Sequence, residues 1–212
     1  MPPYHEIDTS KWNRKDHFGF FKNFDIPFFN ITANVDVTKL VKHSKKEGYS
    51  FFLSSLYYSM KAAHMVEPFR YRILDGKVVC YDKINPGTTA INQEHVFKYT
   101  YLDYQEDMMA FISQSKIDLA EQIKQPGLLP NSGLDVIFYS SIPWISFTSF
   151  QHARRFLKDD SIPRIVFGKY FEENGKYKMP LSVEVSHAMM DGYHVGQYFE
   201  TYQKLLDKIS NP

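Results

Sequence analysis

Hydrophobic and polar positions change their spacing several times along the chain, and each change predicts a new element. Residues 29–37 alternate with a period of two, which predicts a half-buried strand. Before it, Thr9 and Ser10 are candidate N-caps for a helix through KWNRKDHFGFF. After it, helical segments run through VTKLVKHSKKE, which Gly48 ends, and through FFLSSLYYSMKAAHMV, which Pro68 stops.

Two hairpin signals and two further helices follow. FRYRIL and KVVCY flank Asp75-Gly76, and PRIVFGKYFEE and KYKMPLSVEVSHA flank Asn174-Gly175, both of them strong two-residue turn signals. We also expect a strand between Thr88 and Tyr104 and a helix through DMMAFISQSKIDLAEQIK. The loop PGLLPNSG, the strand LDVIFYS, the run PWISFTSF and a final helix from Asp191 complete the pattern.

Helices and hairpins are mixed here without a regular alternation of strand and helix. This pattern predicts an α+β fold with a mainly antiparallel mixed sheet and helices packed on one face. The length of 212 residues and the absence of a linker or repeat predict a single domain over residues 1–212.

Composition narrows the function classes. Lys and Arg number 25 against 24 Asp and Glu, so the chain lacks the basic field that nucleic-acid binding needs. No apolar run approaches a membrane span or a signal sequence, and Cys80 is the single cysteine, which suits the reducing cytoplasm. Aromatic residues reach 17%, enough to line an apolar pocket as well as the core.

The stretch LSVEVSHAMMDGYHVG carries the clearest candidate chemistry. Strand alternation places His187 on the same side as Leu181, Val183 and Val185, at the end of an apolar face. One interpretation is a general base in a partly apolar site; the other is a buried histidine bonded to backbone, with Asp191 as a plain N-cap. Fingerprints of nucleotide-binding loops, zinc proteases and hydrolase elbows are absent from the sequence.

Four phrases of the chain occur in a recognisable order: WNRKDHF, YSSIPWISF, PRIVFGKY and SHAMMDGYHVG. Together they resemble the chloramphenicol acetyltransferase family. His187 matches the second histidine of that family's HHxxxDG signature and Asp191 its aspartate, while Ser186 replaces the first histidine. The resemblance runs from about Ile7 to Ile209, nearly the whole chain.

The resemblance implies a direct transfer of an acetyl group from acetyl-CoA to a hydroxyl of chloramphenicol or a similar small molecule. By similarity, His187 is the general base and Ser140 donates a hydrogen bond to the oxyanion. Asp191 matches the aspartate that pairs with the N-terminal arginine, here Arg14, and braces the loop that carries the histidine. No metal is expected.

The resemblance also implies a homotrimer whose sheet continues between subunits, with each active site at a subunit interface. Lys169 and Tyr170 match CoA-side residues of the family. The acceptor pocket would include Phe20, Phe21, Phe138 and Val166; the last two stand where drug-inactivating members have asparagine and threonine, so we expect a more apolar pocket. Antibiotic resistance is the use that such an enzyme would serve.

Three alternatives remain at this point. The chain could be a non-catalytic protein that binds a hydrophobic ligand on the same fold, or an acyltransferase with another alcohol or thiol as acceptor. Dihydrolipoyl acyltransferase domains share the fold, but Ala188 stands where their H-R-x-x-D-G motif has arginine. A metal site made of His187, Asp191 and His194 is a poor third option, because these residues span a strand end and a helix start.

Overall fold

Seven strands form the main sheet of the structure, a computed structural model that describes residues 3–128, 133–154, 157 and 159–210. Residues 129–132 of the predicted loop PGLLPNSG therefore lie outside the described part. The sheet runs in the order β2-β10-β8-β7-β5-β6, and β9 pairs with β10. Its strands are β2 (Phe28–Asp36), β5 (Asn85–Ile91), β6 (Phe97–Tyr101), β7 (Val136–Ile142), β8 (Arg164–Gly168), β9 (Phe171–Glu173) and β10 (Lys176–Ser186).

A smaller sheet and the helices complete the architecture. The small sheet has the order β1-β4-β3, from β1 (Tyr4–Glu6), β3 (Tyr71–Leu74) and β4 (Lys77–Tyr81). The helices are α1 (Lys15–Phe21), α2 (Thr38–Glu47), α3 (Phe51–Met65), α4 (Met108–Gln122) and α5 (Gly192–Asp207), with a short 3₁₀ helix at Glu67–Arg70.

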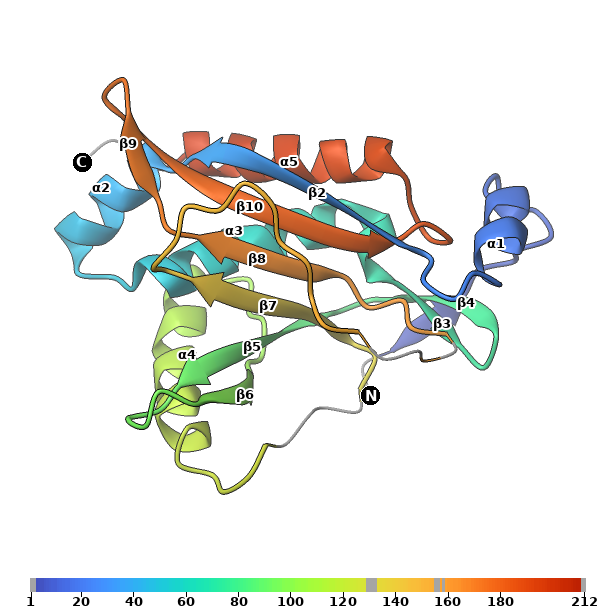
Figure 1. Ribbon diagram of the computed structural model, residues 1–212, viewed down its shortest axis with the longest axis horizontal. Coiled ribbons are helices and arrows are strands. Elements are labelled where there is room, and N and C mark those ends of the chain that lie inside the picture. Colours follow the sequence, from blue (N-terminus) through green and yellow to red (C-terminus); the bar gives the residue numbers. More distant parts are fainter. Residues whose placement is uncertain (1–2, 129–132, 155–156, 158, 211–212) are drawn as a thin grey trace.

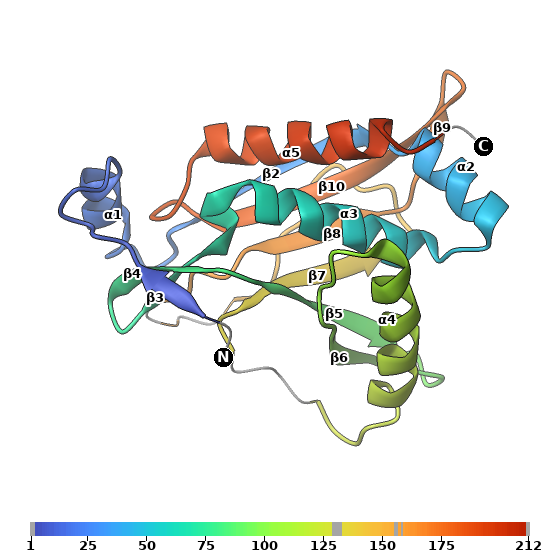
Figure 2. The same ribbon diagram turned by 180° about the vertical axis from the view of Figure 1, so that it is seen from behind.

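The helices cover one face of the main sheet, as predicted. Figure 2 shows α3 and α5 lying along this face, with α4 beside them over the end that β5 and β6 form. The apolar core between the layers includes alternate residues of β10, Leu181, Val183 and Val185, all fully buried. On the opposite face, residues 143–154, which follow β7, cross the sheet without forming a strand (Figure 1).

The sheet is mixed rather than uniformly antiparallel. β5, β7 and β8 run parallel to one another, and the pairs on either side of them, β5 with β6 and β8 with β10, are antiparallel. In this register Ser140 of β7 lies beside Val166 of β8, which in turn lies beside Ser182 of β10. The register fixes which side chains can share a site.

Both predicted hairpin turns are confirmed by their backbone geometry. Asp75 and Gly76 have φ of 51° and 76°, and Asn174 and Gly175 have φ of 53° and 74°. Two successive positive φ values match the twist of paired strands, and Asp, Asn and Gly adopt them at low cost. These turns set the registers of β3 with β4 and of β9 with β10.

Three elements differ from the prediction. The first helix begins at Lys15 rather than after Ser10, because Asp8 accepts hydrogen bonds from Ser10 and holds residues 8–11 in a turn. The single strand predicted between Thr88 and Tyr104 is an antiparallel pair, β5 with β6, joined by a turn that Asn92 stabilises through bonds from Glu94 and Val96. The strand β1 lies before the first predicted element and adds an edge to β4.

Cys80 lies in β4 and is fully buried, and the burial raises the pKa of its thiol. No helix in the part of the chain that the structure describes is both long and apolar enough to cross a membrane.

Candidate active site

His187 directly follows β10, and two contacts position its backbone and ring. Its backbone N–H donates to the carbonyl of Pro27 at 2.6 Å, which extends the pairing of β10 with β2 by one bond. Its ring stacks on Phe21 of α1, with centroids 4.1 Å apart and an interplanar angle of 5°, and tilts against Phe29 at 4.7 Å. The side chain is 36% exposed, so a ligand can reach a ring that its apolar neighbours hold in place.

Arg14 and Asp191 brace the segment that carries this histidine, as the resemblance led us to expect. Arg14 lies just before α1 and is 7% exposed; its guanidinium contacts both carboxylate oxygens of Asp191, with Nη2 donating to Oδ1 at 3.0 Å. The same Nη2 donates to the backbone carbonyl of His187 at 3.1 Å. The hydrogen bonds from Arg14 lower the pKa of the Asp191 carboxyl below its ordinary value.

Asp191 also begins the last helix and approaches the catalytic candidate itself. Its backbone N–H donates to Nδ1 of His194 at 3.0 Å, in a reciprocal cap at the start of α5. Burial lowers the pKa of His194, which favours the neutral ring that accepts this bond. Oδ1 of Asp191 lies 3.2 Å from Nδ1 of His187, without hydrogen-bond geometry. The carboxylate therefore faces Nδ1 and leaves Nε2 as the nitrogen to exchange a proton with a ligand.

Ser140 lies on β7 and lines a groove of about 550 Å³ on the face opposite the helices. This volume is within the usual range for a site that holds a small molecule. The groove has aromatic walls, formed chiefly by Phe97, Tyr99, Phe138 and Trp144.

One chain does not bring Ser140 and His187 together. Ser140 is in register with Ser182, two strands away, and His187 lies five residues beyond Ser182 on the same strand. Strand geometry then separates the two Cα atoms by about 19 Å. A shared site for these two residues requires a second copy of the chain.

Lys169 and Tyr170 line a different cavity, of about 330 Å³, together with Phe51, Phe52 and Gly168. The Tyr170 ring packs against Phe51 of α3, with centroids 5.0 Å apart. An added Cβ at Gly168 would lie 3.0 Å from the Phe147 ring and 3.1 Å from Pro180, so glycine avoids a tight contact here. The cavity has both a cation and apolar walls.

The four predicted acceptor residues occupy three places. Phe138 lines the Ser140 groove. Phe21 stacks on His187, and the neighbouring Phe20 is 63% exposed beside it. Val166 pairs with Ser140 across the strands and is fully buried.

The sequence predicted only Ser140 and Phe138 as site residues among the residues of the groove, and the polar residues that it missed include Arg164 and His152. They make the groove less apolar than we expected from Phe138 and Val166. The signal for Arg164 was available in part: Ile165 and Phe167 face the core, so alternation sends Arg164 to the other face with Val166. Its place beside Phe138 depends on the pairing of β7 with β8, which the sequence does not reveal.

Among the described residues, no group of three or more His, Cys, Asp and Glu side chains is arranged to hold a metal ion. The predicted alternative metal ligands lie close together: His187, Asp191 and His194. However, Arg14 donates to the carboxylate of Asp191, and Nδ1 of His194 accepts a hydrogen bond from the backbone N–H of Asp191.

Comparison with known proteins agrees with this geometry. The family model for chloramphenicol acetyltransferase matches residues 2–203. A chloramphenicol acetyltransferase of Proteus mirabilis is 31% identical over 204 residues, which cover 95% of this chain and 94% of that protein. A solved structure of a chloramphenicol acetyltransferase superposes with a TM-score of 0.88 at 28% identity, covering 96% of this chain and 100% of the other.

The fold is shared more widely. A probable dihydrolipoamide acetyltransferase from Listeria monocytogenes superposes with a TM-score of 0.65 at 15% identity, covering 97% of this chain and 94% of that one; this similarity concerns the fold alone. The match of the family model across nearly the whole chain, together with the 31% identical relative, shows that this chain belongs to the chloramphenicol acetyltransferase family.

Proposed function

We propose that the protein transfers the acetyl group of acetyl-CoA to a hydroxyl of chloramphenicol or a similar small molecule. The observation that carries this proposal is the arrangement at His187: an accessible ring, stacked on Phe21, in a segment that Arg14 and Asp191 brace. A histidine held in this way can take a proton without moving, in a chain whose family consists of acetyltransferases.

The chemistry needs one proton to move twice. Nε2 of His187 takes the proton of the acceptor hydroxyl while the hydroxyl oxygen forms a bond to the carbonyl carbon of the thioester. The tetrahedral intermediate then collapses, the carbon–sulfur bond breaks, and the CoA sulfur leaves with the proton that His187 held. Asp191 stabilises the transient imidazolium, because its carboxylate lies 3.2 Å from Nδ1.

Ser140 supplies the hydrogen bond to the oxyanion in this proposal. Because about 19 Å separates it from His187 within one chain, the serine must come from a neighbouring copy. We therefore propose a trimer in which each site pairs His187 of one subunit with the Ser140 groove of the next. Phe20, Phe24 and Ile26 are exposed beside His187, and Trp144 and Phe97 are exposed at the groove, so both sides of the contact offer apolar surface.

CoA would bind in the cavity that Lys169 and Tyr170 line. The lysine provides a cation for a phosphate, and Phe51, Phe52 and Tyr170 provide apolar surface for the pantetheine arm or the adenine. The cavity lies beside Ser141, the residue that follows the proposed oxyanion donor.

Release of CoA thiol from acetyl-CoA, measured with chloramphenicol and a panel of other hydroxylated acceptors, tests the proposal. We expect thiol release that depends on the acceptor. Calorimetry with acetyl-CoA separates an enzyme from a protein that merely binds a hydrophobic ligand, because a binder need not recognise CoA. Failure to bind acetyl-CoA and failure to release thiol with any acceptor would together refute acetyl transfer.

A further inference from the structure

Charged side chains at one end of the Ser140 groove suggest the class of acceptor. Arg164 and His152 line the groove together with its aromatic wall, and no carboxylate of a described residue lines it. The groove thus presents one guanidinium, which Asp160 contacts from behind, and one histidine to a ligand, on a background of apolar surface. A neutral acceptor would gain no attraction between opposite charges from that guanidinium.

The strand register places the cation at a defined distance from the reacting end of the groove. Arg164 of β8 lies beside Phe138 of β7, and Phe138 is two residues before Ser140. Neighbouring strands put residues of one register on the same face, so all three side chains face the groove. One strand spacing and two residues along the strand put the Cα atoms of Arg164 and Ser140 about 8 Å apart.

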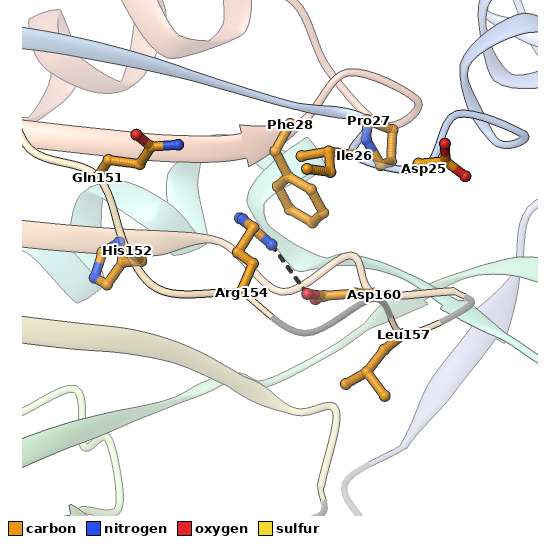
Figure 3. A pocket seen from close by; sticks show the side chains of 9 residues that line it. All are labelled: Asp25, Ile26, Pro27, Phe28, Gln151, His152, Arg154, Leu157 and Asp160. Carbon is orange, nitrogen blue, oxygen red and sulfur yellow. Dashed lines mark hydrogen bonds and ion pairs between the residues drawn. The ribbon is translucent and has the colours of Figure 1, made fainter.

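The structure holds Arg164 in place from behind. Its Nη2 contacts Asp160 at 3.1 Å, and Asp160 also accepts from Arg154 at 3.0 Å. Arg154 in turn binds Glu184, and its guanidinium carbon lies 3.2 Å from the centroid of the Phe28 ring. Figure 3 shows Arg154 between Phe28 and Asp160, in a pocket that adjoins the groove because His152 lines both. Arg164 is therefore fixed by groups that do not themselves line the groove.

Two nitrogen atoms of this network lie near Glu184 but make no hydrogen bond within the described residues. Nη1 of Arg164 is buried and finds no hydrogen-bond acceptor among the described residues; Glu184 Oε1, at 3.6 Å, is beyond hydrogen-bond distance. Nδ1 of His152 is also buried and unpaired within that part of the chain, 3.9 Å from the other oxygen of Glu184. The hydrogen-bonding capacity of these two side chains is therefore only partly used within the described residues, and both side chains line the groove that an oxyanion would enter.

We propose that the preferred acceptor is an amphipathic hydroxy acid, a deeper statement that rests on the proposed acetyl transfer. Its hydroxyl lies at Ser140, its apolar part packs on Phe138 and Trp144, and its carboxylate, or another oxyanion, binds at Arg164 and His152. Arg164 is then a specificity-determining residue. Chloramphenicol, which is neutral, leaves this end of the groove unused.

A matched pair of acceptors tests the proposal: sodium tropate and its methyl ester. Both carry a phenyl ring and the same primary hydroxyl, and they differ in the negative charge. For the wild-type protein we expect a higher kcat/KM for tropate than for the ester. Arg164→Met should lower kcat/KM for tropate by about tenfold to a hundredfold, the effect expected for one charge-assisted hydrogen bond, and change the value for the ester less than about threefold. Arg164→Lys, which keeps the charge, should retain part of the preference.

Arg70→Met is the matched control, because Arg70 is an arginine that donates to the carbonyl of Tyr81 and lies outside both the charge network and the groove. It should affect tropate and its ester equally. Arg164 does not select a charged acceptor if Arg164→Met lowers kcat/KM for tropate and for its ester by the same factor. The proposal is also wrong if the wild-type protein prefers the ester.

Calorimetry with tropate and no acetyl-CoA separates this inference from the proposed function. Binding of tropate that Arg164→Met abolishes supports the oxyanion subsite even where no acetyl group is transferred. Turnover of chloramphenicol without any binding or turnover of tropate overturns the subsite and leaves acetyl transfer standing.

Discussion

His187, the proposed general base, has a side chain that is both accessible and fixed. Phe21 and Phe29 pack on its ring, Arg14 binds its carbonyl oxygen, and Pro27 accepts from its backbone N–H. These partners come from the N-terminal segment and from β2, which are distant in sequence but meet at the end of β10. The ring needs no reorganisation to take a proton, which is the condition for efficient general-base catalysis.

We expect His187→Ala to lower kcat by about 10²-fold to 10⁴-fold, the range typical for loss of a general base. The fold should persist, because the side chain is 36% exposed and the main-chain bonds of residue 187 do not depend on it. Acetyl-transfer assays and circular dichroism measure the two effects. His5→Ala, which removes an exposed histidine of β1, is the control and should leave kcat unchanged. Unaltered turnover in His187→Ala would assign the base elsewhere.

The Arg14–Asp191 pair predicts a particular dependence of stability on pH. Arg14 lowers the pKa of Asp191 in the folded protein, so the folded state favours the ionised carboxylate. The pair's contribution is complete above the ordinary aspartate value of about 4 and is lost as the pH falls through the lower value of the folded state. The free energy of unfolding that the pair contributes therefore decreases in acid.

Urea unfolding at a fixed protein concentration, from pH 7 to pH 2.5, measures this contribution for the wild-type protein and Asp191→Asn. We expect a constant difference in unfolding free energy above pH 5, which shrinks as the pH falls below about 4. A difference that does not vary with pH would mean that the charge of Asp191 makes no contribution and that the variant loses packing alone.

Among individual residues, the sequence predicted the contact between Arg14 and Asp191 but missed the cluster that Arg164 forms with its neighbours. Arg14 and Asp191 lie 177 positions apart, and the family's phrases related them although no local pattern could. Arg164, His152 and Glu184 meet because two strands, β8 and β10, and the segment after β7 converge. Nothing in the spacing of these residues along the chain indicates that convergence.

Among the elements, β3 and β7 are joined by a buried arginine, Arg72, which contacts no carboxylate of the described residues. Arg72 is wholly buried, and burial lowers its pKa to about 10, so it stays charged at neutral pH. Its guanidinium donates to the backbone carbonyls of Phe69, Tyr71, Leu134 and Val136. One side chain thereby connects the small sheet with the start of the strand that carries Ser140.

Arg72→Met should reduce the free energy of unfolding by about 3 kcal/mol or more, because four carbonyl oxygens lose a charged donor together. Arg70→Met is the matched control: Arg70 donates to one carbonyl, that of Tyr81, and its loss should cost about 1 kcal/mol. Urea unfolding at equal protein concentration compares them. Similar losses in the two variants would show that the number of carbonyl contacts is not what matters.

Elements that local chemistry determines were predictable, and those that pairing determines were less so. Ser50 caps α3 and Asp107 caps α4, each by accepting from a backbone N–H three residues ahead, and both hairpin turns formed at the predicted residues. The strand β1 has all three residues exposed, so it shows no alternation to read. The parallel pairing of β7 with β5 and β8 is a property of the sheet as a whole.

For the whole molecule, the spacing of Ser140 and His187 means that the proposed site needs more than one copy of the chain. If each site takes one residue from each of two copies, two inactive variants should restore one another. In a mixed trimer, an intact site forms where a Ser140→Ala subunit supplies the histidine and a His187→Ala subunit supplies the serine. Random mixing in equal amounts would make about a quarter of all sites intact.

The test is to unfold the two variants together, refold the mixture and measure acetyl transfer against each variant refolded alone. We expect roughly a quarter of the wild-type activity from the mixture and very little from either parent. A mixture no more active than its parents, with mixed oligomers present on native mass spectrometry, would mean that the two residues do not share an intersubunit site.

The fold class and the helix-covered face followed from the sequence, because amphipathic helices and alternating strands must bury one side. The sequence does not predict how copies of the chain contact one another. Exposed residues such as Phe20 and Trp144 follow no pattern that identifies the surface they would contact.

The burial of Cys80 has a practical consequence at the bench. Chromogenic aryl disulfides detect free CoA by reacting with its thiolate, and a reactive cysteine in an enzyme would add its own colour. This chain has one cysteine, enclosed in β4 with a raised pKa, so the native protein should give a flat blank. The same reagent should react with Cys80 once the small sheet unfolds. One reagent therefore measures CoA release by the native protein and exposure of Cys80 on unfolding.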